Sequence, residues 1–126
     1  MKVAYVDTSY VVAIAFGERN AKALARRMTR FDELVSANLL DAELHAVFAR
    51  EKVEADVNSF GAISRVIPDR LLDAEITRVL SAGYVRGADC WHLAVALFLA
   101  TAPGTISFLT LDERQHTVAR QLGFRD

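Results

Sequence analysis

Short apolar runs along the chain alternate with longer segments in which apolar residues recur at helical spacing. Residues 3–6, 34–36 and 106–109 form short runs rich in branched or aromatic residues, which indicate buried strands. The apolar spacing elsewhere predicts helices over residues 9–16, 19–31, 39–52, 55–66, 71–82, 88–100 and 112–122. Strands separated by helices of about ten or more residues indicate an α/β fold with a mostly parallel sheet. In such sheets, ligands bind beyond the carboxyl ends of the strands, where the strand order reverses.

The apolar runs are too short to anchor or export the protein. Residues 93–102 fall well under the roughly 20 residues that a membrane-spanning helix needs, and they predict instead a helix that is buried on all sides. Residues 3–6 are too few for the apolar region of a signal peptide. The single cysteine, Cys90, cannot form a disulfide within the chain. We therefore expect a cytoplasmic protein.

Composition limits both the size of the fold and its partners. The 126 residues argue for a single domain, residues 1–126, and 52% apolar residues suffice for a sizeable core. Fifteen Lys and Arg against sixteen Asp and Glu leave a net charge of −1. This balance excludes a protein that binds nucleic acid or an anionic membrane through bulk charge alone, although it permits a local basic patch.

Four carboxylates occupy positions that require an explanation. Asp7 and Asp112 follow the first and the last predicted strands, at the sheet edge where ligands bind. Glu43 lies on the arc of its helix that we expect to face the core, and Asp89 opens the most apolar helix. Each has a separate structural explanation, because Asp is a favoured N-cap, a Glu at a helix edge is partly exposed, and an Asp in a first turn complements the helix dipole. One explanation covers all four if the acids converge at the sheet edge and bind divalent cations.

An all-oxygen set of ligands is typical of Mg²⁺ or Mn²⁺. Mg²⁺ is usually held by one or two carboxylates, while water and substrate phosphates complete its shell. Two ions about 3.5–4 Å apart can generate hydroxide from water and stabilise both oxygens of an in-line displacement. Without a cation, the acids should repel one another, so that one holds a proton or the site loosens. The four carboxylates therefore predict phosphodiester hydrolysis by metal-activated water.

Four short motifs in a fixed order resemble a known family. They are Asp7-Thr8-Ser9, Asp41-Ala42-Glu43-Leu44, Arg86-Gly87-Ala88-Asp89 followed by His92-Leu93-Ala94, and Thr110-Leu111-Asp112-Glu113-Arg114. This set is similar to the motifs of PIN-domain ribonucleases, and most similar to those of VapC-type toxins of bacterial and archaeal toxin–antitoxin pairs. The resemblance runs from residue 1 to residue 126. One departure is Gly87, where the family usually has a better helix former.

The resemblance implies a PIN-like three-layer α/β/α fold with a central, mostly parallel sheet. It also implies an endoribonuclease site that depends on Mg²⁺, for which Mn²⁺ can substitute. The catalytic set is Asp7, Glu43, Asp89 and Asp112, of which Asp7, Asp89 and Asp112 would bind metal. Ser9 and Thr110 would support the site through hydrogen bonds. The partners implied are an RNA substrate, a small cognate antitoxin and a second copy of the chain in a homodimer.

The remaining histidines and the cysteine have simpler explanations. His92 lies one turn from Asp89, but it is flanked by apolar residues and is better explained as a packing residue than as a base. His45 and His116 have no partner at zinc-ligand spacing. Cys90, in an apolar helix, is best explained as a buried structural thiol.

Two groups of basic residues are candidates for RNA contacts. A basic stripe consists of Arg19, Lys22, Arg26 and Arg30, and a stripe of this kind favours a solvated helix face over an RNA contact. Arg86, three residues before Asp89, is the better candidate for a phosphate contact.

Other functions fit parts of this pattern. A Mg²⁺-binding phosphoacceptor signalling domain has a similar length and an acidic pocket, but none of the lysines, Lys2, Lys22 and Lys52, follows a late strand as such a domain requires. A housekeeping RNA-processing PIN nuclease would use the same acids, whereas a PIN-like scaffold would bind a partner without cleaving it. The intact acidic set favours an active nuclease.

Overall fold

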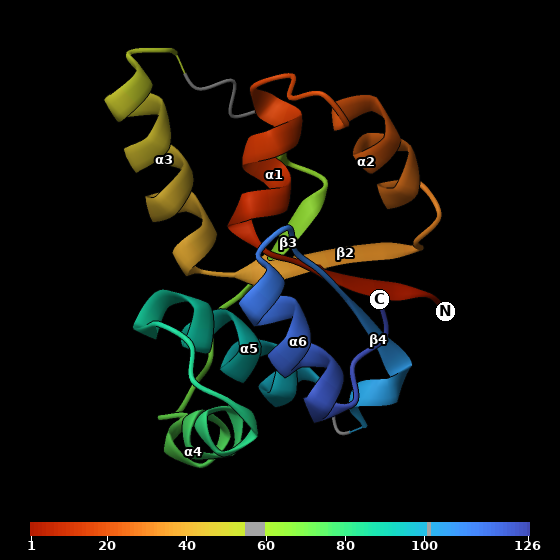
Figure 1. Ribbon diagram of the computed structural model, residues 1–126, viewed down its shortest axis with the longest axis vertical. Coiled ribbons are helices and arrows are strands. Elements are labelled where there is room, and N and C mark those ends of the chain that lie inside the picture. Colours follow the sequence, from red (N-terminus) through yellow and green to blue (C-terminus); the bar gives the residue numbers. More distant parts are fainter. Residues whose placement is uncertain (55–59, 101) are drawn as a thin grey trace.

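A parallel sheet forms the centre of the computed structural model, which describes residues 1–54, 60–100 and 102–126 (Figure 1). Within these residues the sheet has four strands in the order β3-β2-β1-β4. They are β1 (Val3–Val6), β2 (Glu33–Ala37), β3 (Ile63–Val66) and β4 (Ile106–Leu109). The first strand pairs on both sides, since Tyr5 lies opposite Val35 of β2 and Phe108 of β4. The predicted mostly parallel sheet is confirmed.

Helices cover both faces of the sheet. One layer contains α1 (Thr8–Ala15), α2 (Ala21–Met28) and α3 (Leu39–Glu51), and the other contains α4 (Asp73–Ala82), α5 (Gly87–Leu99) and α6 (Glu113–Leu122) (Figure 1). A short 3-10 helix, η2 (Pro103–Thr105), precedes β4. The three-layer α/β/α architecture is therefore confirmed. Of the helices described, none has both the length and the apolar character to span a membrane.

Alternation along the strands divides the core into two clusters. Ala4 and Val6 of β1 pack against the α1 and α3 side, whereas Tyr5 packs against the α5 side. This is the period-2 pattern of a strand with both faces covered. Helix α5 is buried on nearly every side between Leu93 and Leu97, as its uninterrupted apolar sequence predicts. The two clusters hold the sheet between the helical layers.

The strand order places β1 and β4 side by side at a switch point. The chain moves outward from β1 through β2 to β3 and then crosses to the other side of β1 to form β4. The backbone amide of Asp7, just after β1, donates to the carbonyl of Leu109 at the end of β4 at 2.9 Å. The two strands thus end together, and the segments that follow them meet at the edge where an α/β sheet binds its ligands.

The predicted helix over residues 55–66 is wrong in its last four residues, which form a strand. The sequence predicts a helix over residues 55–66, of which 55–59 lie outside the described residues. Ile63–Val66 instead form strand β3, which pairs in parallel with Leu34 to Ala37 of β2. Branched residues favour a strand here, and Pro68 biases the residue before it toward extended backbone. Pairing with β2, which is remote in sequence, outweighs the local helical spacing.

Two glycines close to helix ends have opposite backbone requirements. Gly17 has φ +61° and ends α1 in a Schellman motif, in which its amide bonds to Ile14 at 3.1 Å and that of Glu18 bonds to Ala13 at 3.0 Å. Gly87 is the first residue of α5 and lies outside the left-handed region. A Cβ added at either glycine would meet no atom within 4 Å. The departure from the family pattern at Gly87 therefore leaves the start of α5 in place.

Alanine at these two glycines should change stability in opposite directions. Gly87→Ala should raise the free energy of unfolding by about 0.4–1 kcal/mol, because it restricts the unfolded chain without strain in the helix. Gly17→Ala should lower it by about 1–2 kcal/mol, because an alanine is strained at positive φ. Urea unfolding in EDTA measures both changes. Shifts of the same sign in the two variants would contradict the assigned backbone conformations.

Candidate active site

Asp7 is the most buried of the four predicted acids, with 4% of its surface exposed. It follows β1 and caps α1, since its Oδ2 accepts hydrogen bonds from the Ser9 amide at 3.0 Å and from the Ser9 hydroxyl at 2.7 Å. Its Oδ1 accepts a bond from Nε2 of Gln115 at 3.1 Å. Both carboxylate oxygens are therefore fixed in direction by neutral donors. Asp7 is therefore both the N-cap of α1 and a residue at the edge of the sheet where ligands bind.

The segment after β4 closes against Asp7 and Ser9. The Thr110 hydroxyl lies 3.2 Å from the Ser9 hydroxyl and donates to Oε1 of Gln115 at 2.6 Å. The Leu111 amide donates to the Ser9 oxygen at 3.1 Å. Ser9 and Thr110, both predicted as supporting residues, thus lie in one hydrogen-bonded group with Asp7.

Gln115 connects three parts of the site and is completely buried. Its side-chain amide donates to Asp7 and also to the backbone carbonyl of Asp89 at 3.3 Å. Its backbone amide donates to Oδ1 of Asp112 at 2.8 Å, which makes Asp112 the N-cap of α6. The spacing from Asp112 to Gln115 predicts this cap, but nothing in the sequence predicts that the Gln115 side chain reaches β1 and α5.

Asp89 and Asp112 complete the acidic group on the β4 side. Asp89 lies half-buried in the first turn of α5, and Asp112 is exposed at the start of α6. Burial raises the pKa of Asp89, and the negative charges of Asp7, Asp112 and Glu43 raise it further. The four predicted acids are therefore close enough to repel one another, and Asp89 is the one whose ionisation this repulsion opposes.

Glu43 has a different electrostatic environment. Its side chain on α3 is 30% exposed, and Oε1 accepts a hydrogen bond from the Thr8 hydroxyl at 2.7 Å and lies 2.6 Å from Nε2 of His92. Burial acts to raise the pKa of Glu43, but the hydrogen bonds from His92 and Thr8 outweigh burial and lower it. A carboxylate that faces the core needs polar partners, and for Glu43 these partners are Thr8 and His92.

His92 is buried and hydrogen-bonded, as expected of a packing residue, but its partners belong to the acidic site. Nδ1 lies 2.7 Å from the Tyr5 hydroxyl, and Nε2 lies 3.7 Å from Oδ1 of Asp7 as well as beside Glu43. The spacing of three residues places His92 on the same face of α5 as Asp89. This spacing is the only sign of the arrangement in the sequence, since Tyr5 and Glu43 are remote in the chain.

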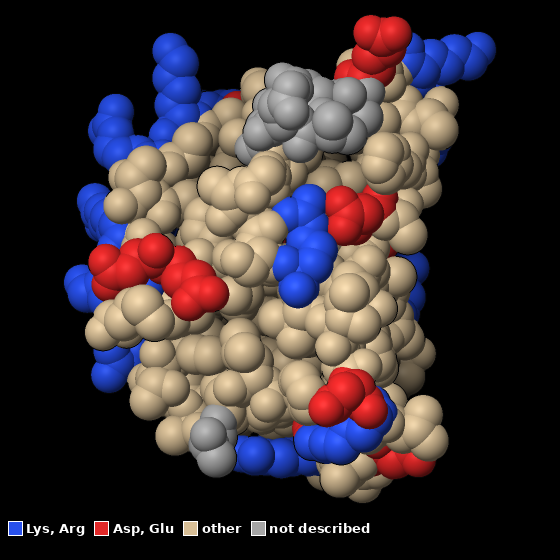
Figure 2. Space-filling view, turned by 180° about the vertical axis from the view of Figure 1, so that it is seen from behind, with Lys and Arg blue, Asp and Glu red and all other residues tan. Residues whose placement is uncertain are grey.

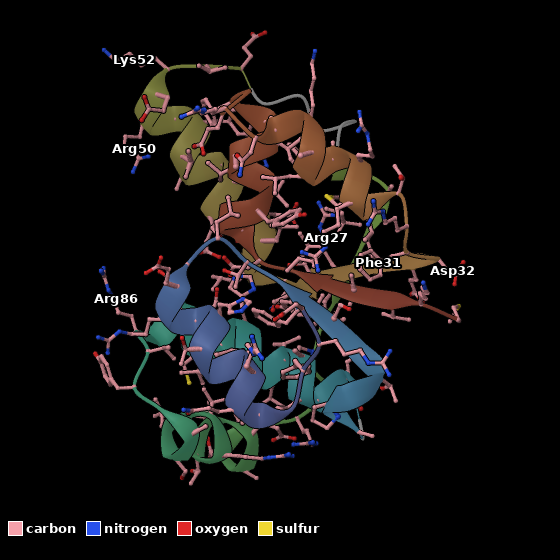
Figure 3. All side chains as sticks on the ribbon, turned by 45° about the vertical axis from the view of Figure 1, so that its right-hand side comes forward. Arg27, Phe31, Asp32, Arg50, Lys52 and Arg86 are labelled. Atoms are coloured by element: carbon pink, nitrogen blue, oxygen red, sulfur yellow. The ribbon has the colours of Figure 1, made fainter. Side chains whose placement is uncertain are left out.

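Three further residues lie outside this group. The side chain of Arg86 projects outward beside the start of α5, where it is exposed (Figure 3). Cys90 is buried, and burial raises the pKa of its thiol, in agreement with a structural role. Nε2 of His116 lies 3.2 Å from Oδ1 of Asp126.

The predicted basic stripe lies at the surface of the protein. The basic stripe, Arg19, Lys22, Arg26 and Arg30, lies on and around α2, with all four side chains exposed. On the face opposite that of Figure 1, many Lys and Arg side chains project along one margin, and others lie near the centre and along the lower edge (Figure 2). Exposure of the stripe agrees with the predicted solvated helix face.

The donor set of the acidic group fits a hard divalent cation. The candidate ligands are carboxylate oxygens. Burial raises the pKa of Asp89, and the nearby negative charges, which a cation would neutralise, raise it further. In the described residues, no three His, Cys, Asp or Glu side chains form a ready metal cage. Mg²⁺ does not need such a cage, because one or two carboxylates with water and substrate phosphate usually hold it. Asp7 and Asp89 are the candidate pair, since the Gln115 side chain bonds to the Asp7 carboxylate and to the Asp89 carbonyl.

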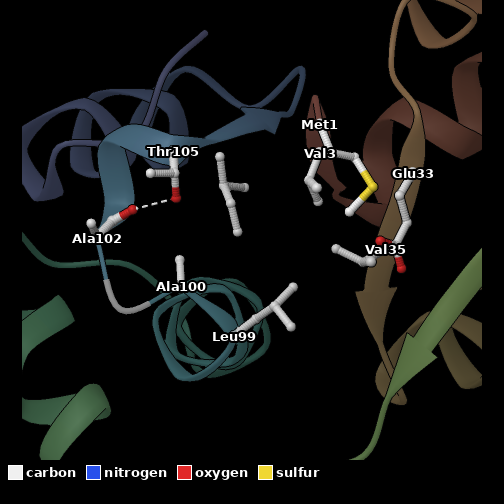
Figure 4. A pocket seen from close by; sticks show the side chains of 9 residues that line it. Met1, Val3, Glu33, Val35, Leu99, Ala100, Ala102 and Thr105 are labelled. Carbon is white, nitrogen blue, oxygen red and sulfur yellow. Dashed lines mark hydrogen bonds between the residues drawn. The ribbon is translucent and has the colours of Figure 1, made fainter.

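Two hollows lie at opposite ends of the sheet. A cavity of about 400 Å³ lies at the amino ends of β1, β2 and β4, and Glu33 is the only carboxylate among its lining residues (Figure 4). A cleft of about 750 Å³ runs between α4 and α6 and includes Asp112. The exposed Tyr84 and Leu111 also line this second cleft. Of these two hollows, only the second adjoins the acidic group.

Comparison with known proteins gives one family. Residues 4–121 match the PIN domain, whereas no curated protein matches the chain. PIN domains are generally nucleases and generally use divalent metal ions, usually Mg²⁺. The matched region contains Asp7, Glu43, Asp89 and Asp112, together with the described sheet except for Val3, the first residue of β1. With this match over nearly its whole length, the chain belongs to the PIN-domain family.

Proposed function

We propose that this protein is a Mg²⁺-dependent endoribonuclease whose site consists of Asp7, Glu43, Asp89 and Asp112. The observation that carries the proposal is the convergence of acids from separate segments at the switch point of the sheet, where Gln115 bonds to Asp7, Asp89 and Asp112. Burial and the neighbouring negative charges together raise the pKa of Asp89 there. A fold gains no stability from four carboxylates placed together, so their assembly points to a ligand of opposite charge. The PIN family match supports a nuclease, and RNA follows from the similarity to PIN-domain ribonucleases.

Different residues of the protein would have different roles in such a reaction. Asp7 and Asp89, assisted by Asp112, would hold the cation, and Mn²⁺ would substitute for Mg²⁺. When bound, the cation would lower the pKa of water and neutralise charge on the phosphate. Ser9 and Gln115 keep the Asp7 carboxylate in one orientation. Arg86, exposed beside the start of α5, would contact a phosphate of the RNA backbone.

We further propose that the protein is the toxin of a toxin–antitoxin pair and forms a homodimer. The similarity to VapC-type toxins supports this role, and the cleft beside Asp112 supports a partner segment that covers the acids. Tyr84 and Leu111 in this cleft are 68% and 40% exposed, which suits the apolar side of an amphipathic segment. An Arg or Lys of the antitoxin would pair with the carboxylates in place of the cation. A housekeeping RNA-processing nuclease would use the same acids without this partner.

The toxin role is tested by expressing the protein alone and together with the small protein encoded next to it. Expression alone should slow growth, and coexpression should restore growth and give a purified complex. An Ala in place of the partner's basic residue should weaken inhibition. Normal growth on expression alone, or no copurifying partner, would contradict the toxin role and favour the housekeeping nuclease.

Removal of one acidic charge should abolish cleavage without loss of the fold. Asp7→Asn and Asp89→Asn keep side-chain volume but remove a charge that the cation needs, so kcat with Mg²⁺ should fall by more than about 100-fold. Asp73→Asn, an exposed first-turn acid in α4, is the matched control and should retain full activity. Circular dichroism verifies the fold. Full activity of both site variants would refute the proposed site.

The same variant, Asp89→Asn, should lose activity but gain stability when no cation is bound. The raised folded-state pKa of Asp89 means that its ionisation destabilises the fold as pH rises above the unfolded value of about 3.9. Asp89→Asn should therefore have a higher Tm than wild type in EDTA at pH 7, and the difference should disappear at pH values below the unfolded pKa.

Added cation tests whether the lower Tm of wild type in EDTA comes from repulsion among the acids. Millimolar Mn²⁺ should raise the Tm of wild type more than that of Asp89→Asn, because it binds the native state of wild type more tightly. Asp73→Asn should not gain stability in EDTA. Equal Tm values for wild type and Asp89→Asn in EDTA, or equal gains with Mn²⁺, would contradict a shared cation site.

A further inference from the structure

A buried hydrogen-bonded chain links the core of the sheet to one catalytic carboxylate. Tyr5 of β1 and His92 of α5 are both 0% exposed, and the Tyr5 hydroxyl lies 2.7 Å from Nδ1 of His92. On its other side, the ring places Nε2 at 2.6 Å from Oε1 of Glu43. Glu43 belongs to the opposite helical layer, so this contact joins α5 to α3 across the edge of the sheet.

The chemistry of the groups fixes the proton on one ring nitrogen. A carboxylate only accepts hydrogen bonds, so Nε2 must carry a proton at this distance from Glu43. The lowered pKa of Glu43, in which hydrogen bonds from His92 and Thr8 outweigh burial, agrees with an ionised carboxylate. Tyr5 holds the other nitrogen, Nδ1, and thereby fixes the plane of the ring. The Tyr5 ring is itself fixed, since it stacks on Phe108 with centroids 5.1 Å apart.

The two donors of the site converge on the same oxygen of Glu43. Oε1 accepts from the Thr8 hydroxyl at 2.7 Å and from His92, whereas Oε2 has no hydrogen-bond partner in the described part of the chain. The Glu43 side chain is 30% exposed, so the side chain is only partly covered by the protein. One oxygen is thus used to hold the carboxylate, and the other remains able to accept a bond from a ligand.

We propose that His92 is a positioning residue that, with Tyr5 and Thr8, holds Glu43 by Oε1 and directs Oε2 to the cation or to its water. This inference rests on the proposed nuclease function. A free Glu side chain beside Asp7 would turn away from the like charge, and the donors from His92 and Thr8 oppose that movement. Partners of this kind typically change metal affinity or activity by about 10–100-fold when they are removed.

The Tyr5 hydroxyl allows a test with a matched control. Tyr5→Phe keeps the ring and its stack on Phe108 but leaves Nδ1 without a partner, so the imidazole loses its fixed plane. Tyr10→Phe removes the other well-buried tyrosine hydroxyl, which bonds to the Leu24 carbonyl at 3.3 Å and lies away from the acids. Any general effect of the lost hydroxyl should be common to the two variants.

Three measurements on the full chain distinguish positioning from general stability. Nitrogen-15 NMR of the metal-free wild type should show a protonated Nε2 on His92. Tyr5→Phe should bind Mn²⁺ more weakly, or have a lower kcat with little change in KM, by about 10–100-fold, whereas Tyr10→Phe should match wild type. His92→Gln, which can still donate toward Glu43, should retain more Mn²⁺ affinity than His92→Asn, which is too short to reach it. This second pair tests the proposal if Tyr5→Phe does not fold.

The results separate the two proposals. A wild type that neither binds Mn²⁺ nor cleaves RNA would overturn the nuclease function. If the wild type does both, a bare Nε2 on His92, a Tyr5→Phe variant equal to Tyr10→Phe, or equal affinities of His92→Gln and His92→Asn would overturn the positioning role alone.

Discussion

Repulsion among carboxylates at the carboxyl edge of the sheet is the constraint on which the rest of the site depends. Burial and the neighbouring carboxylates both raise the pKa of Asp89, so ionisation of this residue raises the free energy of the folded state. The protein holds the acids in place with donors rather than with positive side chains. Ser9 and Gln115 bond to Asp7, while Thr8 and His92 bond to Glu43. No Lys or Arg of the described residues forms an ion pair with any of the four acids.

The hydrophobic core supplies the rigidity that this arrangement needs. Ala4, Tyr5 and Val6 of β1 are completely buried between the two helical layers, so the position of Asp7 at the end of the strand is fixed by packing. Helix α5 is equally buried, and it carries both Asp89 and His92 on one face. Because interiors are close-packed, movement of either element would disturb many contacts at once. The acids are therefore kept together by the core of the sheet as well as by local hydrogen bonds.

The sequence predicts the parts of this site that depend on local pattern. Strand ends and helix starts follow from short apolar runs and from capping residues, so the positions of Asp7, Asp89 and Asp112 could be predicted. Strand β3 could not, because its conformation depends on pairing with β2, which is remote in sequence. Gln115 shows the same limit, because its cap with Asp112 is local whereas its bonds to Asp7 and Asp89 need the folded sheet. For His92, the apolar neighbours correctly predict burial, but its partners Tyr5 and Glu43 come from other elements.

The central claim is that acids from four separate segments form one cation site. A crystal structure of the wild type grown with Mn²⁺, with data collected at the manganese absorption edge, tests it most directly. The account predicts an anomalous peak bonded to carboxylate oxygens of Asp7 and Asp89, beside Asp112 at the ends of β1 and β4. Manganese bound elsewhere, with an empty acidic edge at saturating Mn²⁺, would contradict the account.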